Sequence, residues 1–588
     1  MLIQKKIILL LSTFVLWNCG KDSDNLNDET LQDPIENLES ADAIFGNRIA
    51  WDFTTKKIIS DPEDSGYNGY PRLIELQDGS LLATYESQGN VIIKKSSDKG
   101  ENWAAPILVA SFNAGVNMAT PDVIQLQNGT ILLAYNPRPG ASAAPNEKFL
   151  IKTILSNDGG LNWLNDQVVY EGDTVFENGV WEPSVIQLPN GEIQLFFSNE
   201  NVYRNSNEQN ISLIRSLDNG VTWTTDPEIA SFRAGSRDGM PSPLLLNDHN
   251  TIVYSIEDNG INNQFKPYII RNTLTENWKQ TVNGNSTNRN YSLQEPLDNS
   301  EYAGAPYLAK FSTGEILLSY QGTENRNGND LNNADMKVAI GSITATDFNR
   351  TSVPFIIPEG KSALWNSISV LSDDTVVALT TTNAYSNNNA PQVWMIKGHL
   401  IPEKPINYGT LNIDGETAEN YWTESLPIFI GQKSNTQLHA NIISDNENLY
   451  ILTKVNDAFI SKTSTSIQNN DGTVLYLDPM KKNYVVPGSG VFKIIISVSN
   501  QIQVFEGYNS NWQEVELPEI ETIVNENIDG YIQETKIPWN SIGGKPNKNS
   551  HIGMTMELIE RGNSLYTETL SGTKNDKPNT WLNLKITQ

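Results

Sequence analysis

The chain alternates apolar and polar residues in a repeated two-part pattern. An alternating run leads into a tight turn, and a second run returns from it, as in LIELQDGSLLATYE and VIQLPNGEIQLFFS. A period of two around Asp-Gly or Asn-Gly predicts a β-hairpin. Five of the hairpins follow a proline and the sixth, ALWNSISVLSDDTVVAL, has Trp365 at that place; the prolines are Pro71, Pro121, Pro183, Pro241 and Pro306.

Six units of roughly 50 to 65 residues have the bulk of propeller blades. We therefore predict an all-β chain with a six-bladed β-propeller over residues 45–403. The segment NRIAWDFTTKKIIS precedes the first unit and is expected to supply the outer strand that closes the last blade. An eight-stranded barrel or a sandwich would not give spacing this long and even.

A second repeat supports the same architecture. Three octapeptides, SSDKGENW (96–103), SNDGGLNW (156–163) and SLDNGVTW (216–223), share the pattern Ser-x-Asp-x-Gly-x-x-Trp. In this turn the Asp side chain binds the loop backbone, the Gly adopts a left-handed conformation and the Trp fills the gap between strands. The pattern resembles the Asp-box of sialidase-like β-propellers, whose turns lie on the outside of the blades, away from the chemistry.

In a propeller, both strands of each inner hairpin reach the same central mouth. We define a first ring, just before the repeat prolines, and a second ring, at the ends of the returning strands. The first ring is expected to contain Tyr70, Thr120, Glu182, Met240, Ala305 and Leu364. The second ring is Glu86, Asn136, Ser198, Glu257, Gln321 and Thr381. All members of the second ring are polar, which predicts a wet mouth that faces a ligand.

Two acidic residues at this mouth are the candidate catalytic pair. Glu182 and Glu257 come from the third and fourth units, and two nearby carboxyl groups in a half-buried cleft do not both ionise freely. Glycosidic cleavage needs such a division of one acid and one carboxylate. Glu86 is a spare carboxyl group that could take one of the roles. The residues expected to bind the substrate are Arg72, Arg138, Trp181, Arg237, Asp238, Trp365 and Asn366.

Three segments resemble glycoside hydrolase family 93, the exo-α-L-arabinanases. They are WEPSVIQLPNG (181–191), SRDGMP (236–241) and TIVYSIE (251–257). The resemblance implies a six-bladed propeller that removes arabinobiose from linear α-1,5-L-arabinan and retains the anomeric configuration. It also implies Glu257 as the nucleophile and Glu182 as the acid/base.

Two alternatives remain open. A sialidase shares the Asp-boxes, but its site needs three arginines on a carboxylate and a tyrosine nucleophile. Arg72, Arg237 and Arg326 could supply the arginines, whereas alternation points Tyr320 into its blade. A glutamate at a strand end can also simply satisfy loop amides, and the protein would then be a non-catalytic glycan-binding lipoprotein.

Residues 404–588 have a different sequence pattern: apolar and polar residues still alternate, but the Asp-box motif does not occur. The segments LNIDGETAENYWTES, VLYLDP, DGYIQETKIPWNSIG and NTWLNLKITQ predict a β-sandwich. Their order resembles carbohydrate-binding module family 9, which implies a sugar clamped by tryptophans and calcium held by acidic residues. Trp422, Trp539 and Trp581 are expected to be structural, and Trp512 is the exposed candidate for sugar binding.

The N-terminus predicts export. Lys5 and Lys6 precede an apolar run from Ile7 to Trp17, which is too short for a permanent membrane span. The single cysteine, Cys19, resembles the acylation site of a bacterial lipoprotein, although an ordinary signal peptide is the alternative. We expect a signal peptide over 1–19, an acidic disordered tether over 20–44, and a surface-exposed outer-membrane lipoprotein.

The net charge and the small numbers of histidine and cysteine residues exclude several classes of binding partner. Lys+Arg 41 against Asp+Glu 69 gives a formal net charge of -28, which argues against nucleic acid and against an anionic membrane surface. Four histidines and one cysteine make a His/Cys metal cluster unlikely to form, so no catalytic metal is expected. We expect a polysaccharide or oligosaccharide substrate, membrane contact only through the lipid, and no cofactor apart from a possible structural calcium ion in the C-terminal domain.

Overall fold

The computed structural model describes residues 48–401, 403–416, 428–430, 436–562, 565–570 and 573–588. The predicted signal peptide, Cys19 and the tether lie outside the described residues, as does Trp422. In the described part, the regular elements are strands and short 3₁₀ turns. No helix in that part is long and apolar enough to cross a membrane.

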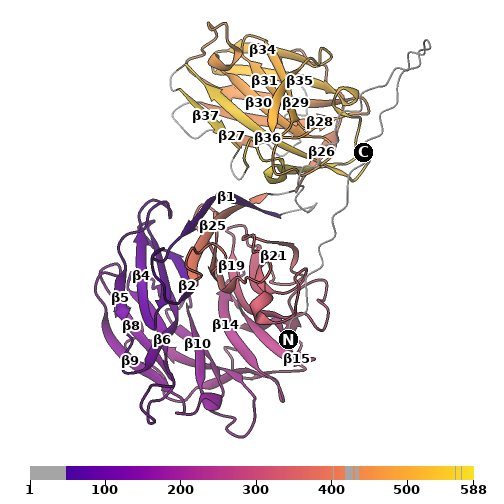
Figure 1. Ribbon diagram of the computed structural model, residues 1–588. Helices are drawn as coiled ribbons and strands as arrows, with labels where there is room; N and C mark the ends of the chain where they lie inside the picture. The colour runs from indigo at the N-terminus through magenta and orange to yellow at the C-terminus, as the bar shows by residue number, and fades with distance from the viewer. Residues whose placement is uncertain (1–47, 402, 417–427, 431–435, 563–564, 571–572) are drawn as a thin grey trace, which may run out of the picture. The chain divides into compact units, whose positions relative to one another are not determined.

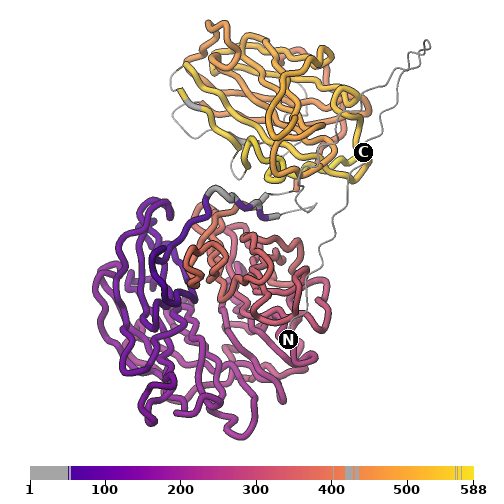
Figure 2. The backbone as a smooth tube through the Cα atoms, in the orientation of Figure 1, coloured from indigo at the N-terminus to yellow at the C-terminus, as the bar shows by residue number. Residues whose placement is uncertain are grey.

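Six antiparallel sheets form the blades of a propeller, and the chain runs through them in order from indigo to orange (Figure 2). Blade 1 contains β2 (Asn68–Glu75), β3 (Leu81–Ser87), β4 (Asn90–Ser96) and β5 (Ile107–Ala110). Blade 2 contains β6 (Val116–Gln125), β7 (Ile131–Pro139), β8 (Leu150–Ser156) and β9 (Leu164–Glu171). Blade 3 contains β10 (Val180–Gln187), β11 (Ile193–Asn199), β12 (Asn210–Ser216) and β13 (Glu228–Phe232). Blade 4 contains β14 (Asp238–Leu245), β15 (Thr251–Ile261), β16 (Gln264–Thr273) and β18 (Arg289–Tyr291). Blade 5 contains β19 (Ala303–Lys310), β20 (Ile316–Gly322), β21 (Asp335–Gly341) and β22 (Asn349–Ser352). Blade 6 contains β23 (Leu364–Val370), β24 (Val376–Thr382), β25 (Gln392–Ile401) and β1 (Arg48–Ile58).

The N-terminal strand closes the ring, as predicted. β1 pairs antiparallel with β25, with Trp51 opposite Gly398, and the two strands lie side by side in Figure 1. Blade 6 also binds blade 1 directly, because Ser367 Oγ donates to the Pro71 carbonyl at 2.7 Å. The loop between β16 and β18 of blade 4 contains a short strand, β17 (Val282–Asn283), which pairs in parallel with β13 of blade 3.

The Asp-box turns connect the third and fourth strands of blades 1 to 3 and confirm the predicted geometry. In the first turn, Ser96 Oγ donates to Asp98 Oδ1 at 2.8 Å, and Asp98 accepts the Asn102 amide at 2.8 Å. Gly100 is left-handed, with φ of 86°. The partly buried Trp103 packs against the apolar cluster shared by blades 6 and 1. These turns therefore stabilise the junctions between blades.

Each inner hairpin contains a β-bulge at the place that the prolines mark. The strand register shifts across two residues in all six blades, for example between Trp181 and Ser184 in blade 3. The first bulge residue has a positive φ, which is uncommon outside glycine. These residues are Tyr70 (52°), Thr120 (43°), Glu182 (46°), Met240 (52°), Ala305 (46°) and Trp365 (55°). The predicted first ring is thus right in five blades and wrong in the sixth, where Trp365 replaces Leu364.

Side chains of the second ring accept hydrogen bonds from the backbone amides of bulge residues in neighbouring blades. Glu257 Oε2 accepts the Ala305 amide at 2.8 Å, and Gln321 Oε1 accepts the Trp365 amide at 2.8 Å. Ser198 and Thr381 accept the amides of Met240 and Tyr70 in the same way. A buried amide needs an acceptor, so polarity in this ring is a requirement of the fold. The interpretation of the whole ring as a wet, ligand-facing surface is wrong.

The C-terminal strands form a β-sandwich, as predicted. They are β26 (Glu403–Tyr408), β27 (Ile428–Ile430), β28 (Gln437–Ser444), β29 (Asn448–Asn456), β30 (Gly472–Asp478), β31 (Phe492–Ser497), β32 (Ile502–Tyr508), β33 (Asn511–Val515), β34 (Glu521–Asn527), β35 (Gly530–Pro538), β36 (His551–Glu560), β37 (Tyr566–Thr569) and β38 (Leu582–Ile586). β26 pairs with β38 in one sheet and with β28 in the other. Trp539 and Trp581 are buried, which confirms them as structural. Trp512 is half-buried against Tyr476 and is less exposed than expected.

Candidate active site

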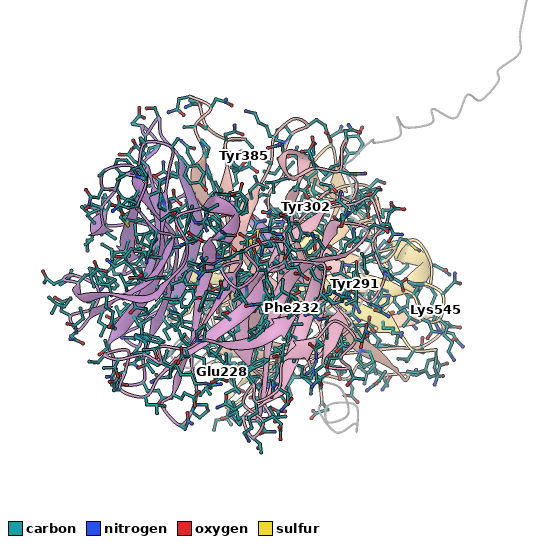
Figure 3. All side chains as sticks on the ribbon, turned by 90° about the horizontal axis from the view of Figure 1, so that it is seen from below. Glu228, Phe232, Tyr291, Tyr302, Tyr385 and Lys545 are labelled. Atoms are coloured by element: carbon teal, nitrogen blue, oxygen red, sulfur yellow. The ribbon has the colours of Figure 1, made fainter. Side chains whose placement is uncertain are left out.

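One cavity of about 510 Å³ opens where the inner strands of the propeller end. Its walls come from blades 1, 2, 3, 4 and 6. Figure 3 draws the side chains of the described residues on the ribbon. It is lined by Tyr70, Asn117, Arg138, Pro139, Phe149, Phe176, Glu177, Trp181, Glu182, Glu200, Asn207, Gln209, Arg237, Glu257 and Trp365. The structure thus brings together both candidate carboxyl groups and four predicted binding residues, namely Arg138, Trp181, Arg237 and Trp365.

Glu182 is the bulge residue of β10 and is partly exposed to the cavity. Its Oε1 lies 3.3 Å from Arg138 Nη2, and the two side chains are 19% and 21% exposed. Arg138 is fixed by Asn136 Oδ1 at 2.7 Å and by Thr120 Oγ1 at 3.3 Å. Glu182 thus combines a left-handed backbone, with φ of 46°, with a contact to Arg138.

Glu257 is the second-ring residue of β15. Its burial raises its pKa to about 7; the hydrogen bond from the Ala305 amide opposes this rise and the negative charge of Glu182 adds to it. Glu257 therefore holds a proton through most of the acidic range, whereas a glutamate with the ordinary pKa of 4.5 is half ionised at that pH.

Aromatic rings form two walls of the cavity. On one side, Tyr70 stacks on Trp365, with ring centroids 4.6 Å apart and planes at 13°. On the other side, Trp181 donates from Nε1 to Glu200 Oε2 at 2.8 Å. Glu200 is ion-paired with Arg237, whose Nη2 donates to Gln209 Oε1 at 2.8 Å. Aromatic faces beside carboxylates and amides are suited to a ligand with both apolar and hydroxyl-rich faces.

Three residues predicted to bind substrate do not line this cavity. Arg72 lies over the Tyr307 ring, 4.7 Å from its centroid, and approaches Asp122. Asp238 is fully buried in an ion pair with Arg289. Asn366 is buried and donates to the Ala363 carbonyl at 3.2 Å. Asn366 occupies the proline position of its bulge, and its side chain is buried. Arg72 lines a separate small cavity together with Glu182. A role in substrate binding is therefore not supported by the main cavity for these three residues, and it stays a prediction.

Glu200 is a cavity residue that the sequence analysis missed, and it follows a simple rule. It stands two positions after the second-ring residue Ser198, as the predicted Arg138 does after Asn136, so alternation continues past the ring and returns it to the same face. Phe176, by contrast, comes from the loop between β9 and β10, around the 3₁₀ turn η1 (Phe176–Asn178). No strand period predicts a loop residue of this kind.

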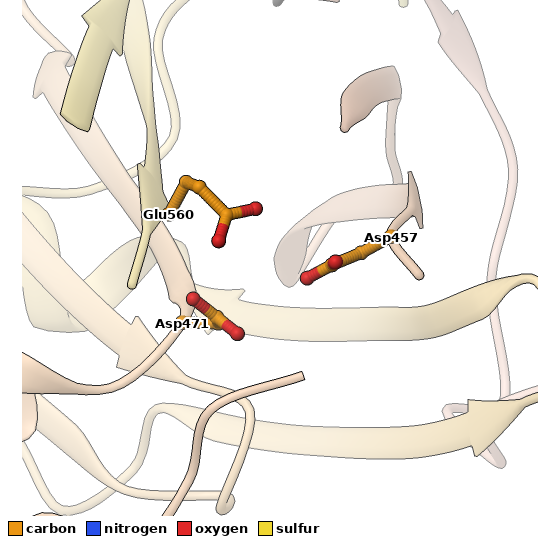
Figure 4. A group of neighbouring side chains, drawn as sticks. All are labelled: Asp457, Asp471 and Glu560. Carbon is orange, nitrogen blue, oxygen red and sulfur yellow. The ribbon is translucent and has the colours of Figure 1, made fainter. Parts of the chain in front are cut away.

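A second cluster of carboxyl groups lies in the sandwich. One oxygen from each of Asp457, Asp471 and Glu560 lies within 4.8 Å of the others, and the three side chains converge in Figure 4. All three are buried, and Asp457 Oδ2 has no hydrogen-bond partner. Burial raises the pKa of Asp471 to about 6. Oxygen ligands from several carboxylates are the donor set that Ca²⁺ prefers.

Part of the chain is similar to known sequences. Residues 413–586 match a family model described as "Carbohydrate family 9 binding domain-like". Endo-1,4-beta-xylanase C of Paenibacillus barcinonensis is 26% identical over 187 residues, which are 29% of this chain and 15% of that protein. The chain therefore spans only a small part of the length of this curated relative.

Two solved structures are similar to a larger share of the chain. An α-L-arabinanase of Penicillium chrysogenum complexed with arabinobiose is 20% identical, with a TM-score of 0.42, over 58% of this chain and 97% of that one. The GH93 α-L-arabinofuranosidase of Fusarium graminearum complexed with arabinobiose is 18% identical, with a TM-score of 0.41, over 60% and 98%. No residue role follows from similarity at this level.

Proposed function

We propose that the propeller is an exo-acting, retaining glycoside hydrolase whose substrate is a neutral polysaccharide side chain, with α-1,5-L-arabinan as the leading candidate. The observation that carries this proposal is that Glu182 and Glu257 line one cavity with aromatic walls. The choice of arabinan rests on the resemblance of the three motifs around residues 181–191, 236–241 and 251–257.

We assign Glu257 as the nucleophile and Glu182 as the acid/base, as the motif resemblance implies; both side chains are partly exposed. A nucleophile is best held rigidly, and the Ala305 amide fixes Glu257. An acid/base must give a proton to the leaving group and recover one from water, which suits the partly exposed Glu182.

In the first step, the ionised Glu257 carboxylate attacks the anomeric carbon while the glycosidic C–O bond breaks. Glu182 gives its proton to the departing oxygen. In the second step, Glu182 takes a proton from water, the oxygen of that water attacks the anomeric carbon, and the bond to Glu257 breaks. Two displacements at one carbon retain the configuration.

The charge of the cavity supports a neutral substrate. Four glutamates line it, namely Glu177, Glu182, Glu200 and Glu257, whereas its arginines, Arg138 and Arg237, are both paired with glutamates. A sialic acid carboxylate would meet a surplus of negative charge.

The residues that a sialidase would need are also engaged elsewhere. Arg326 donates to the carbonyls of Asn333, Ile357, Pro358 and Lys361. Tyr320 is buried and donates to Glu324 at 2.6 Å. The sialidase alternative is therefore less well supported.

For the sandwich, we propose carbohydrate binding with a structural calcium ion. The match over residues 413–586 supports the first part, and the unpartnered oxygen of Asp457 beside Asp471 and Glu560 supports the second. In this role the ion would tie the three strand ends together and neutralise their charge. Removing calcium with a chelator should lower the melting temperature of the full chain, and Asp457→Asn should abolish that dependence.

We also propose that Cys19 is acylated and anchors the protein at the cell surface. The test is Cys19→Ala, which should move the full chain from the membrane fraction to the soluble fraction of an expressing bacterium. Unchanged fractionation, together with protection from added protease in intact cells, would contradict a surface anchor.

Product analysis after incubation with linear arabinan and other pectic side chains tests the enzymatic proposal. We expect the parent protein to release a single short product with retained configuration. The Glu182→Gln and Glu257→Gln variants should release no product. If the parent protein binds these glycans saturably without releasing any product, the non-catalytic alternative holds.

A further inference from the structure

Glu182 lines a second, smaller cavity in addition to the one that it shares with Glu257. The second cavity has a volume of about 10 Å³, which is roughly the space that one water molecule needs. Its walls come from the inner strands of blades 1 to 5, namely β2, β6, β10, β14 and β19. Its polar lining residues are Arg72, Thr120, Glu182, Ser184 and Tyr307. Among the described residues, Glu182 alone lines both cavities.

Arg72 brings hydrogen-bond donors without a protein acceptor to this cavity. Its side chain is 11% exposed, and a guanidinium group carries five N–H donors. Among the described residues it donates one hydrogen bond, from Nη1 to the Pro71 carbonyl at 2.9 Å. Its Nε lies 4.0 Å from Asp122 Oδ1, which is an ion pair but too long for a hydrogen bond. Because buried donors are rarely left without an acceptor, the remaining N–H groups of Arg72 indicate an acceptor inside the cavity.

Two neighbours hold the Arg72 side chain at this place. The guanidinium lies over the Tyr307 ring, 4.7 Å from its centroid, and a cation is attracted to the face of an aromatic ring. The buried Asp122 attracts Arg72 and accepts from Ser184 Oγ at 2.9 Å. Ser184 stands two positions after Glu182 on β10. The carboxylate that holds Arg72 therefore also fixes the strand that carries Glu182.

We propose that the small cavity holds one water molecule, which accepts a hydrogen bond from Arg72 and donates one to the carboxyl group of Glu182. Arg72 is then a positioning residue, because it acts through this water and does not line the cavity proposed for the substrate. The inference rests on the proposed function, in which Glu182 is the acid/base. A buried water makes about three hydrogen bonds, and the Thr120 and Ser184 hydroxyls on the same lining supply further partners.

The water molecule helps Glu182 to release its proton. When Glu182 protonates the departing oxygen it becomes a carboxylate, and a water that is already in place donates a hydrogen bond to the new negative charge. Hydrogen bonds to charged groups are stronger than hydrogen bonds between neutral groups. The donors of Arg72 bind the oxygen of the water, so its hydrogen atoms face away from Arg72 and one of them reaches Glu182. The water loses no proton in either step and is not consumed.

The water site predicts a dependence on the leaving group. The sugar that departs from an arabino-oligosaccharide needs the proton of Glu182, whereas a dinitrophenolate departs without it. Arg72→Met should therefore lower kcat/KM on the oligosaccharide by about 10-fold more than on the dinitrophenyl glycoside of the same sugar. Equal losses on the two substrates would indicate a purely structural role for Arg72. That result, or no loss on either substrate, would overturn the proposal.

The matched control is Arg271→Met. Arg271 is also a partly buried arginine of the propeller, and its Nη2 donates to the Thr344 carbonyl at 2.7 Å, but it lines neither of the two cavities. Its replacement should leave the ratio of kcat/KM on the two substrates unchanged. A change in this ratio as large as that in Arg72→Met would mean that the selectivity follows from a general loss of stability, and would contradict the role of Arg72.

A crystal structure of the parent protein separates failure of the water site from failure of the proposed function, because it requires no activity. The expected result is an ordered water molecule within hydrogen-bonding distance of both the Arg72 guanidinium and the Glu182 carboxyl group. If the protein hydrolyses nothing but this water is present, the water site holds and the proposed function fails. A cavity without water, or a water that contacts Arg72 but not Glu182, overturns the inference even in an active enzyme.

Discussion

Glu86 in blade 1 and Glu257 in blade 4 occupy the same position of the inner hairpin but differ in their access to the cavity. Each accepts an amide from the next blade, Thr120 in one case and Ala305 in the other. Burial raises the pKa of both to about 7. Only Glu257 lines the cavity. A raised pKa is here a product of the propeller architecture, and access to a ligand distinguishes the catalytic candidate.

The largest expected difference between the two residues is in activity. Glu257→Gln should lower kcat by about 10²- to 10⁴-fold, because an amide cannot act as the nucleophile. Glu86→Gln keeps an acceptor for the Thr120 amide and should change kcat by less than about 3-fold. Initial rates on linear arabinan measure both. Comparable losses in the two variants would show that the comparison is mistaken.

Blade 4 also differs in a buried ionic network beside Glu257. Arg289 is ion-paired with Asp238 and Asp258, and all three side chains are fully buried. Arg289→Met would leave the buried Asp238 without an ion-pair partner, while Asp258 keeps Arg233 at 2.8 Å, and should lower the free energy of unfolding by about 3 to 5 kcal/mol. Lys148→Met breaks the exposed pair with Glu171 and should cost less than about 1 kcal/mol. Denaturant unfolding of the two variants checks the contrast.

The acidic limb of the pH dependence of activity should report the ionisation of Glu257 and not that of Glu86. Because the nucleophile must be ionised and its pKa is about 7, kcat/KM should fall as the pH drops through about 7. Glu86→Gln should leave this acidic limb in place. A limb on the alkaline side near pH 7, with activity lost as the pH rises, would instead assign the acid role to Glu257.

Stability should respond to both residues alike. A carboxyl group whose folded pKa of about 7 exceeds its ordinary value of 4.5 binds more protons in the folded state between these values. The free energy of unfolding should therefore decrease as the pH rises from about 4.5 to about 7. Glu86→Gln and Glu257→Gln should each reduce this slope, as measured by denaturant unfolding at several pH values. A slope unaffected by both variants would contradict the raised pKa values.

The smallest expected effect connects the two members of the catalytic pair. The negative charge of Glu182 contributes to the raised pKa of Glu257. Glu182→Gln should thus move the pKa of Glu257 down, in the direction of its ordinary value. Carbon-detected NMR titration of labelled glutamate carboxyls can follow this shift. An unchanged or higher pKa would show that the two groups do not interact.

The sequence predicted the hairpins, the closing strand and the Asp-box turns because each depends on local periodicity or turn chemistry. It misplaced the first ring in blade 6, where Asn366 replaces the proline that marks the other bulges. It also could not predict that Asp238 pairs with Arg289, because the two residues meet only through the fold. Phe176 was missed for a related reason, since its loop has no strand period.

Trapping the glycosyl-enzyme with a slow substrate analogue, followed by mass spectrometry of the digested protein, tests the central claim most directly. The expected result is a single covalent sugar adduct on the peptide that contains Glu257, absent in Glu257→Gln and present in Glu86→Gln. An adduct on Glu182 or Glu86, or turnover of the analogue with inverted configuration and no adduct, would contradict the account.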